Sequence, residues 1–155
     1  ITYDAATNDC DEVLASKIVW LDAFITNVDR TFKNTNLLIW KKELWLIDHG
    51  AAFYFHHSWD NWKTTATTPF TLIKDHVLLP KATKLQEAHN EFTSKLTENS
   101  IKELVNKIPE DWLLWEDKSL SPEEIKEVYF QFLSIRLANA EIFLKQAQDA
   151  RTTLI

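Results

Sequence analysis

Gly50 is the only glycine in this chain of 155 residues. Glycine lets a backbone turn sharply or approach a bound phosphate closely, so its scarcity limits the loops that the chain can build. A Walker A loop and a glycine-rich nucleotide lid each need several glycines, and the sequence therefore excludes both from residues 1–155. The one glycine directly follows Asp48 and His49 at the end of an apolar run, which makes this position the first candidate for function.

Composition favours a single folded domain over residues 1–155. Hydrophobic residues make up 45% of the chain, including 7 Trp and 9 Phe, and this content argues against disorder and supplies a sizeable core. The formal net charge is −6 and no run of Lys or Arg interrupts it. The sequence therefore argues against direct binding of nucleic acid.

Cys10 is the single cysteine, so the chain forms no internal disulfide and no thiolate metal cluster. No apolar run approaches the roughly 20 residues that span a bilayer, and residues 1–10 do not have the pattern of a signal peptide. We expect a cytoplasmic protein that does not bind membranes. The chain contains no Met and begins with the bulky Ile1, so we also expect it to be a fragment of a longer protein.

The apolar periodicity predicts a mainly α fold with a small β-hairpin. A helix capped by Asn8 or Asp9 is expected to continue to about Thr26. Its buried stripe is predicted to contain Leu14, Ile18, Leu21 and Ile25. Two short apolar runs, 37–40 and 44–47, predict the hairpin, although its turn lacks the Gly or Asn that hairpin turns favour.

The rest of the chain is predicted to be helical after an irregular segment, 51–68, that is packed by its aromatic rings. Helices are expected over roughly 69–80, 82–96 and 97–108, and from 122 toward 150, either continuous or broken near 138–140. Thr97 is the predicted cap of the helix over 97–108. Ser121, followed by Pro122 and by Glu124 at the capping-box position, predicts the start of the last helical region.

Two acidic motifs lie on either side of the predicted hairpin. An Asp, an Asn five residues later, and a hairpin that ends in Asp-x-Gly occur in this order in the phosphotransfer loops of protein kinases. A carboxylate beside the acceptor hydroxyl orients it and takes its proton, which suits Asp29. A second carboxylate holds Mg²⁺, which suits Asp48, and Asn34 supplies a neutral oxygen ligand.

Charged neighbours of these motifs are candidates to balance phosphate charge. Lys33 adjoins Asn34 and is the strongest of them, ahead of Arg30 and His49, so it joins Asp29 among the catalytic candidates. Gly50 is expected to allow a sharp turn at the cofactor-binding position, with positive φ. The alternative is that the Asp and Asn residues of both motifs are turn formers without a role in catalysis.

The two motifs, together with residues 55–57 and 73–80, resemble the HipA-like kinases of bacteria, and the resemblance covers nearly the whole chain. It implies the helical carboxy-terminal lobe of a protein-kinase-like fold that phosphorylates Ser or Thr of a protein substrate, using ATP and Mg²⁺. Relatives act as toxins beside an antitoxin. By motif position, the resemblance implies that Asp29 is the base and that Asn34 and Asp48 are the metal ligands.

The sequence departs from this pattern in two ways. Eukaryotic-type kinases have His-Arg before the catalytic Asp and Lys two residues after it, where this chain has Asn27-Val28 and Thr31; HipA-like enzymes vary in the same direction. Only 28 residues precede Asp29, so we expect the amino-terminal lobe with its nucleotide lid to come from elsewhere, in cis or from another chain. The fragment alone is expected to be inactive.

Three other interpretations stay open. A catalytically inactive module with the shape of a kinase lobe would bind a protein partner or regulator, and exposed aromatic residues could form its docking face; the candidates are Trp40, Trp45, Trp59 and Trp62. A metal-dependent phosphohydrolase would use Asp75, His76 and His89. A third interpretation is a metal site at His56 and His57. Adjacent side chains on an extended chain face opposite ways and rarely bind one ion together, so both residues are expected to be structural or to lie in a substrate segment.

Overall fold

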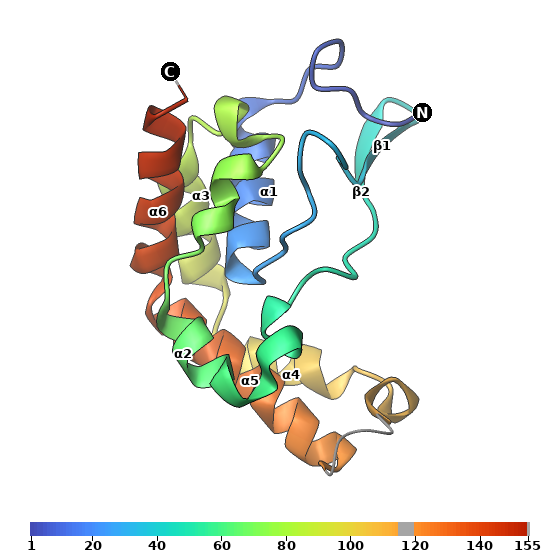
Figure 1. The fold of residues 1–155 in the computed structure, drawn as a ribbon, viewed down its shortest axis with the longest axis vertical. Coiled ribbons are helices and arrows are strands. Elements are labelled where there is room, and N and C mark those ends of the chain that lie inside the picture. The colour runs from blue at the N-terminus through green and yellow to red at the C-terminus, as the bar shows by residue number, and fades with distance from the viewer. Residues whose placement is uncertain (115–119, 155) are drawn as a thin grey trace.

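The computed structural model describes residues 1–114 and 120–154, and 59% of the chain is helical (Figure 1). The helices α1 to α6 span Glu12–Phe24, Trp62–Thr67, Leu85–Lys95, Glu98–Asn106, Pro122–Ala138 and Ala140–Thr152. The 3-10 helices η1 to η4 span Tyr54–Asn61, Thr71–Asp75, Leu79–Lys81 and Glu110–Leu113. Within the described residues, strands β1, Leu37–Trp40, and β2, Glu43–Leu46, form a two-stranded antiparallel sheet. The predicted mainly α fold with a small hairpin is confirmed.

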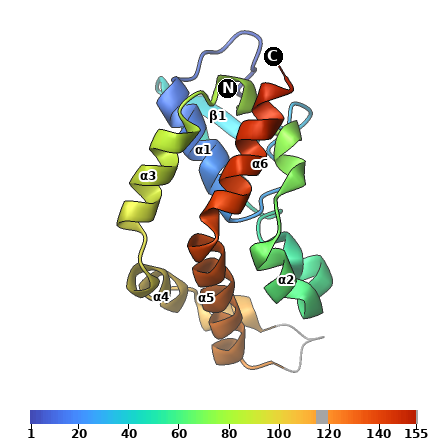
Figure 2. The ribbon, with the colours of Figure 1, turned by 90° about the vertical axis from the view of Figure 1, so that its left-hand side faces the viewer.

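The helices surround two hydrophobic cores. Helices α1, α3 and α6 lie side by side around the first core, and α2, α4 and α5 enclose the second (Figures 1 and 2). The first core centres on Trp20, whose ring stacks on Phe24 and Phe92 with centroid distances of 5.2 and 4.7 Å and meets the edge of Phe143. Truncating such a buried ring to Ala costs about 3–5 kcal/mol.

The first helix begins later and ends earlier than its sequence predicts. The carboxylate of Asp11, and not Asn8 or Asp9, caps α1 by accepting the backbone N–H groups of Val13 and Leu14. Asp9 instead contacts Lys81 at 2.8 Å. The helix ends at Phe24, and Thr26 has a φ of +53°, which a continuing helix does not allow. The predicted stripe is also partly wrong, because Leu14 is exposed while the core face centres on Trp20.

The hairpin forms where it is predicted, with β2 starting one residue early. Leu37 pairs with Leu46 and Trp40 pairs with Glu43. The two turn residues between the strands have φ values of +50° and +70° although both are lysines, the conformation that suits the twist of a two-residue hairpin. The chain start extends this sheet by a bridge, because the N–H of Tyr3 donates to the carbonyl of Leu37 at 2.9 Å.

Segment 51–68 is less irregular than predicted, because η1 and α2 occupy most of it. Its expected packing by aromatic rings is confirmed. Phe55 lies 4.5 Å from Phe132 of α5 between ring centroids, and Phe53 lies 5.2 Å from Tyr129. The local sequence does not predict these helical turns, because they are stabilised by packing against aromatic rings of α5, which are distant in the sequence.

Helices α4 and α5 begin at their predicted capping boxes, whereas the expected helix over 69–80 is replaced by the short 3-10 helices η2 and η3. Thr97 and Ser100 exchange capping-box hydrogen bonds at the start of α4, and Ser121 and Glu124 do so at the start of α5. Of the two options for the last helical region, the break is the correct one, because Asn139 separates α5 from α6.

Arg136 of α5 joins the two cores. The residue is 1% exposed, and its guanidinium donates to the carbonyls of Ala23 and Phe24, which end α1, and over longer distances to those of Thr65 and Thr68. Burial lowers the pKa of Arg136 to about 10, which leaves it charged at neutral pH. A cation at this end of α1 also complements the helix dipole.

Candidate active site

The loop between α1 and β1 carries the first candidate group. Asp29 is half-buried, and one carboxylate oxygen, Oδ2, accepts both the side-chain amide of Asn34 at 2.7 Å and that of Asn36 at 3.1 Å. The other oxygen, Oδ1, accepts no hydrogen bond from any described residue. The loop thus orients the carboxylate through one oxygen and leaves the second for a ligand.

Asn36 is a site residue that the sequence reasoning missed. It is buried, its φ is +47°, and its amide also lies 3.4 Å from the backbone carbonyl of Asp29. The signal that was present is a second Asn two residues after Asn34, directly before the hairpin. Asn tolerates the left-handed backbone conformation better than most residues.

Asn34 is exposed, and its bond to Asp29 decides which of its atoms is free. Because Nδ2 donates to Asp29, the amide oxygen Oδ1 is the atom that remains for another partner. Amide and carboxylate oxygens are the protein ligands that Mg²⁺ accepts. The donor set of this loop therefore fits a magnesium ion.

Asp48 follows β2 in an exposed turn that also contains Gly50. Asp48 has a φ of +49°, and its Oδ1 accepts the N–H of Gly50 at 3.2 Å. The expected positive φ at Gly50 is wrong, since the positive φ lies at Asp48. A Cβ at position 50 would lie 3.2 Å from the Asp48 carboxylate, so the glycine makes room for that carboxylate.

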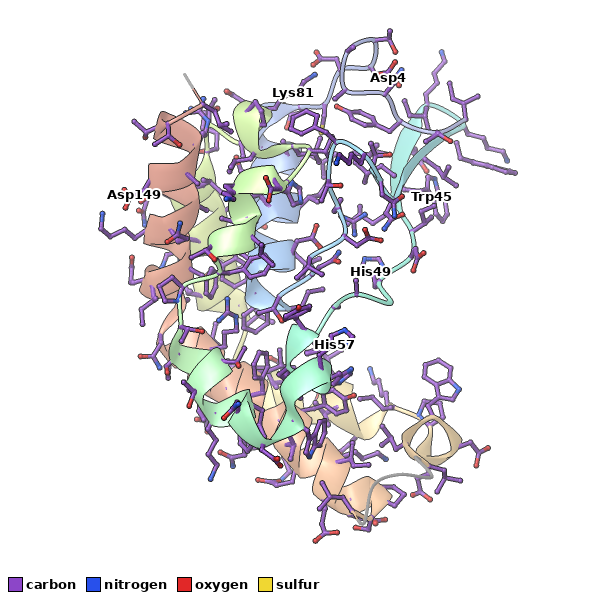
Figure 3. All side chains as sticks on the ribbon, in the orientation of Figure 1. Asp4, Trp45, His49, His57, Lys81 and Asp149 are labelled. Carbon is purple, nitrogen blue, oxygen red and sulfur yellow. The ribbon has the colours of Figure 1, made fainter. Side chains whose placement is uncertain are left out.

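Backbone bonds and one side-chain contact hold the two loops together. Ile47 donates to the carbonyl of Asn36 at 3.0 Å, and Val28 donates to that of Ala51 at 3.4 Å. His49, labelled in Figure 3, lies 3.2 Å from the guanidinium of Arg30. Among the described residues, hydrogen bonds connect Asp29 directly to Asn34, whereas Asp48 reaches that loop through its chain neighbours.

Arg30 has a structural position and not the exposed one expected of a phosphate-balancing residue. It is 1% exposed, and its Nε lies 2.6 Å from Oδ2 of Asp22 on α1, which is fully buried. Its NH1 donates to the carbonyl of Asn36. Since an Arg only donates, its contact with His49 requires the imidazole Nε2 to be the acceptor. Arg30 thus ties the base of the loop to both α1 and the second motif.

Asp22 is the centre of a buried network that the sequence reasoning also missed. Besides Arg30, it accepts the amide of Asn27 at 3.0 Å and lies 2.9 Å from Nε2 of His76. Burial by itself raises the pKa of Asp22, but the hydrogen bonds from His76 and Arg30 and the positive charge of Arg30 outweigh it and hold the pKa below its usual value. The carboxylate is therefore ionised at neutral pH.

His76 in this network is neutral and has a defined tautomer. Burial lowers its pKa by more than the hydrogen bond to Asp22 raises it. The N–H of Leu78 donates to Nδ1 at 3.0 Å, so the ring proton lies on Nε2 and is donated to Asp22. The network connects residues between positions 22 and 76 and anchors the loop that carries Asp29 to α1.

A pocket of about 710 Å³ borders the loop. Its walls come from the chain start, the loop, the hairpin and residue 77, and Lys33 and Asn34 belong to its lining. Lys33 is exposed, as expected of a residue that meets a ligand. Asp29 and Asp48 are not part of the lining, so the pocket adjoins the acidic groups without containing them.

The four candidate docking tryptophans divide into two groups. Trp40 and Trp45 on the hairpin are 59% and 51% exposed, and Trp45 is seen on the hairpin in Figure 3. Leu38 pairs with Trp45, so it shares their face, while the opposite face of the hairpin packs on the first core. Trp59 and Trp62 pack against the second core. The hairpin pair is therefore the candidate docking face.

The phosphohydrolase interpretation finds no support in the geometry. His76 is bound to Asp22, Asp75 is exposed, and His89 contacts Trp20 and Glu141. Over 1–114 and 120–154, no three His, Cys, Asp or Glu side chains are grouped to hold a metal ion.

His56 is exposed, and its Nε2 lies 2.7 Å from the hydroxyl of Tyr129, which belongs to the second core. This fits its expected structural role, while His57 is exposed beside Tyr54.

In the described part of the chain, none of the helices combines the length and apolarity needed to cross a membrane.

Comparison with known proteins identifies the family. A family model described as HipA-like kinase matches residues 1–142. No curated protein and no solved structure matches the chain. Because the family match covers most of the 155 residues, the chain belongs to the HipA-like kinase family.

Proposed function

We propose that this chain is the phosphotransfer lobe of a Ser/Thr protein kinase that uses ATP and Mg²⁺. The observation that carries the proposal is the hydrogen bond between Asp29 and Asn34, which leaves one oxygen of each side chain unused. An acid and an amide held in this way, next to a loop that presents Asp48, match the needs of phosphoryl transfer. The family match supports the same class of activity.

In this proposal, Asp29 acts on the acceptor hydroxyl of the protein substrate. Its Oδ1, free of bonds to described residues, accepts the hydroxyl proton and orients the oxygen toward the γ-phosphorus. The new O–P bond forms as the bond to the leaving ADP oxygen breaks. Asn36 and Asn34 keep the carboxylate from rotating, which maintains this alignment.

The residues present fit a magnesium ion. Oδ1 of Asn34 and the second carboxylate oxygen of Asp48 are the atoms that would hold it, since the first Asp48 oxygen binds the N–H of Gly50. When bound, the ion supplies neutralisation of the charge on the transferred phosphate. Arg30 and His49 keep the two ligand-bearing loops together.

The pocket of about 710 Å³ is proposed to receive ATP. Its volume lies within the roughly 300–1,000 Å³ typical of small-molecule sites. Exposed Lys33 at its lining is proposed to balance the phosphate charge, and Asn34 lies at the same border. The single glycine of the chain cannot form a glycine-rich lid, so the lid is proposed to come from an amino-terminal lobe that rests on Trp40 and Trp45.

Phosphotransfer assays test the proposal. The full-length protein should transfer the γ-phosphoryl group of ATP to Ser or Thr, and Asp29→Asn should lower kcat by about 10²–10⁴-fold while circular dichroism stays unchanged. Unchanged transfer by Asp29→Asn would remove Asp29 from the role of base.

The alternative, an inactive lobe that binds a protein regulator, is favoured by the exposure of Trp40 and Trp45. Calorimetric titration with Mg–ATP separates the two proposals. Binding by the full-length protein and its loss in Asp48→Asn supports the kinase, whereas absence of binding in the full-length protein supports the regulator-binding module. Residues 1–155 alone should bind Mg–ATP weakly.

A further inference from the structure

A second pocket shares Phe32 with the proposed ATP pocket. It has a volume of about 500 Å³ and lies between the loop and η2; its lining consists of Thr31, Phe32, Lys33, Lys74, Asp75 and Leu154. Phe32 and Lys33 line both pockets. A molecule in this second pocket would therefore lie beside the nucleotide and next to the loop that presents Asp29.

The backbone holds Phe32 outward at this place. Thr31 donates to the carbonyl of Asn34 at 2.9 Å, which closes a tight turn, and it forms a bridge with His76. Val77 adds a bond to the carbonyl of Arg30 at 3.0 Å. The turn is thus anchored on the segment after η2, and the ring of Phe32 remains 57% exposed at its tip. A large ring displayed by a fixed turn offers an apolar contact without the cost of ordering a mobile loop.

The charge around Phe32 is locally positive. Lys33 and Lys74 are both exposed, and neither forms an ion pair with any described residue. Asp75 is the one carboxylate in the lining, against these two lysines. The chain as a whole carries a net charge of −6, so the local charge here is opposite in sign to the net charge of the chain.

We propose that Phe32 and Lys74 form the docking surface for the protein substrate and select acidic side chains close to the phosphoacceptor Ser or Thr. The proposal rests on the proposed kinase function and extends it to the substrate class. The apolar part of the peptide lies against Phe32, and its carboxylate meets Lys74. Nucleic acid does not fit this surface, because two lysines beside Asp75 on an acidic chain are too few to neutralise a phosphate backbone.

Peptide phosphorylation by the full-length protein tests this surface. The probe is a library of Ser- or Thr-centred peptides in which one flanking position at a time is fixed as Asp, Ala or Lys. We expect the unaltered protein to favour Asp over Ala at one or more positions by about two- to fivefold in kcat/KM, the range that an exposed ion pair supplies. Lys74→Glu should reverse this preference toward Lys, through KM and not through kcat.

Lys107→Glu is the matched control, because it makes the same charge change at an exposed residue that follows α4; it should leave the preference unchanged. An equal preference in the unaltered protein and in Lys74→Glu would overturn the docking proposal while leaving the kinase function intact. Phosphorylation without any acidic preference would overturn it in the same way. No transfer by the unaltered protein would overturn the kinase function, and the docking proposal with it.

Discussion

Asp22 and Asp29 stand seven residues apart in the chain, one on α1 and the other on the loop that follows. Asp22 is fully buried and has donors on both carboxylate oxygens, from Asn27, Arg30 and His76. Asp29 is half-buried, and its two donors share a single oxygen. The comparison separates a carboxylate that maintains the structure from one that stays available to a ligand, and the difference lies in how many of its oxygens are occupied.

The largest expected effect follows from removing the buried charge. Asp22→Asn should destabilise the protein by about 3–5 kcal/mol, because Arg30 would be left buried without its anion. Asp29→Asn should change the free energy of unfolding by no more than about 0.5 kcal/mol, as is usual outside a buried network. Urea unfolding of the two variants measures both. Similar losses in the two would mean that the structural and ligand-binding roles are not separated.

The next effect distinguishes the two amides that hold Asp29. Asn34→Ala should raise the Mg²⁺ concentration for half-maximal transfer by about 10–100-fold, the scale of losing a group at a metal site. Asn36→Ala removes a donor to the same Asp29 oxygen but no proposed metal ligand, so it should lower kcat with little change in the Mg²⁺ requirement. Magnesium titration of the phosphotransfer rate is the measurement. A shared rise in the Mg²⁺ requirement would contradict the assignment of Asn34.

A smaller effect appears as a pH dependence of stability. Because burial lowers the pKa of His76, the folded state holds it neutral, whereas the unfolded chain protonates near its usual pKa of about 6.5. Its stabilising contribution is therefore present above about pH 6.5 and is lost as the pH falls toward the lower folded pKa, by about 1 kcal/mol per pH unit. Asp22, with its own pKa held low, adds a loss of the same sign at still lower pH.

Urea midpoints at pH 7.5 and 5.5 check this prediction. His76→Gln, which keeps a donor for Asp22, should be less stable than the unaltered protein at pH 7.5 and lose less on acidification. His57→Gln, at an exposed histidine of η1, should retain the full pH dependence. If both variants lose as much stability between pH 7.5 and 5.5 as the unaltered protein, His76 is not the source of the pH dependence.

The smallest effect concerns Gly50. Its φ is not positive, so Gly50→Ala brings no backbone strain of the left-handed kind, and the free energy of unfolding should change by less than about 1 kcal/mol. The added Cβ would lie 3.2 Å from Asp48 Oδ1, so the carboxylate must shift by a few tenths of an ångström. We expect a several-fold rise in the Mg²⁺ concentration needed for half-maximal transfer. A loss of stability above about 1 kcal/mol with an unchanged Mg²⁺ requirement would contradict this explanation.

Features that depend on near neighbours were predictable from the sequence. The capping boxes at Thr97 and Ser121 rest on residues three positions apart, and the contact of Asp29 with Asn34 spans five. The hairpin also follows from local alternation and apolar runs. By contrast, the cap of α1 at Asp11 was missed because Asn8 and Asp9 are equally good capping residues by type.

The buried half of the site was not predictable because its partners are distant. Asp22 meets His76 across 54 positions, and no local pattern connects an Asp within an apolar helix to a His after η2. Arg30 is buried in the same network, although its charge and its position beside Asp29 predicted an exposed residue. The positive φ at Asp48 and the backbone bond of its neighbour Ile47 to Asn36 are likewise absent from the sequence spacing.

Arg136 sets an order of events during synthesis. The carbonyls that it holds end α1, 113 and 112 positions earlier, and the loop with Asp29 departs from that helix end. A ribosome completes the loop long before it reaches α5, and contacts of such separation form late in folding. We therefore expect the loop to acquire its final geometry only after α5 has been synthesised and Arg136 has bound the end of α1.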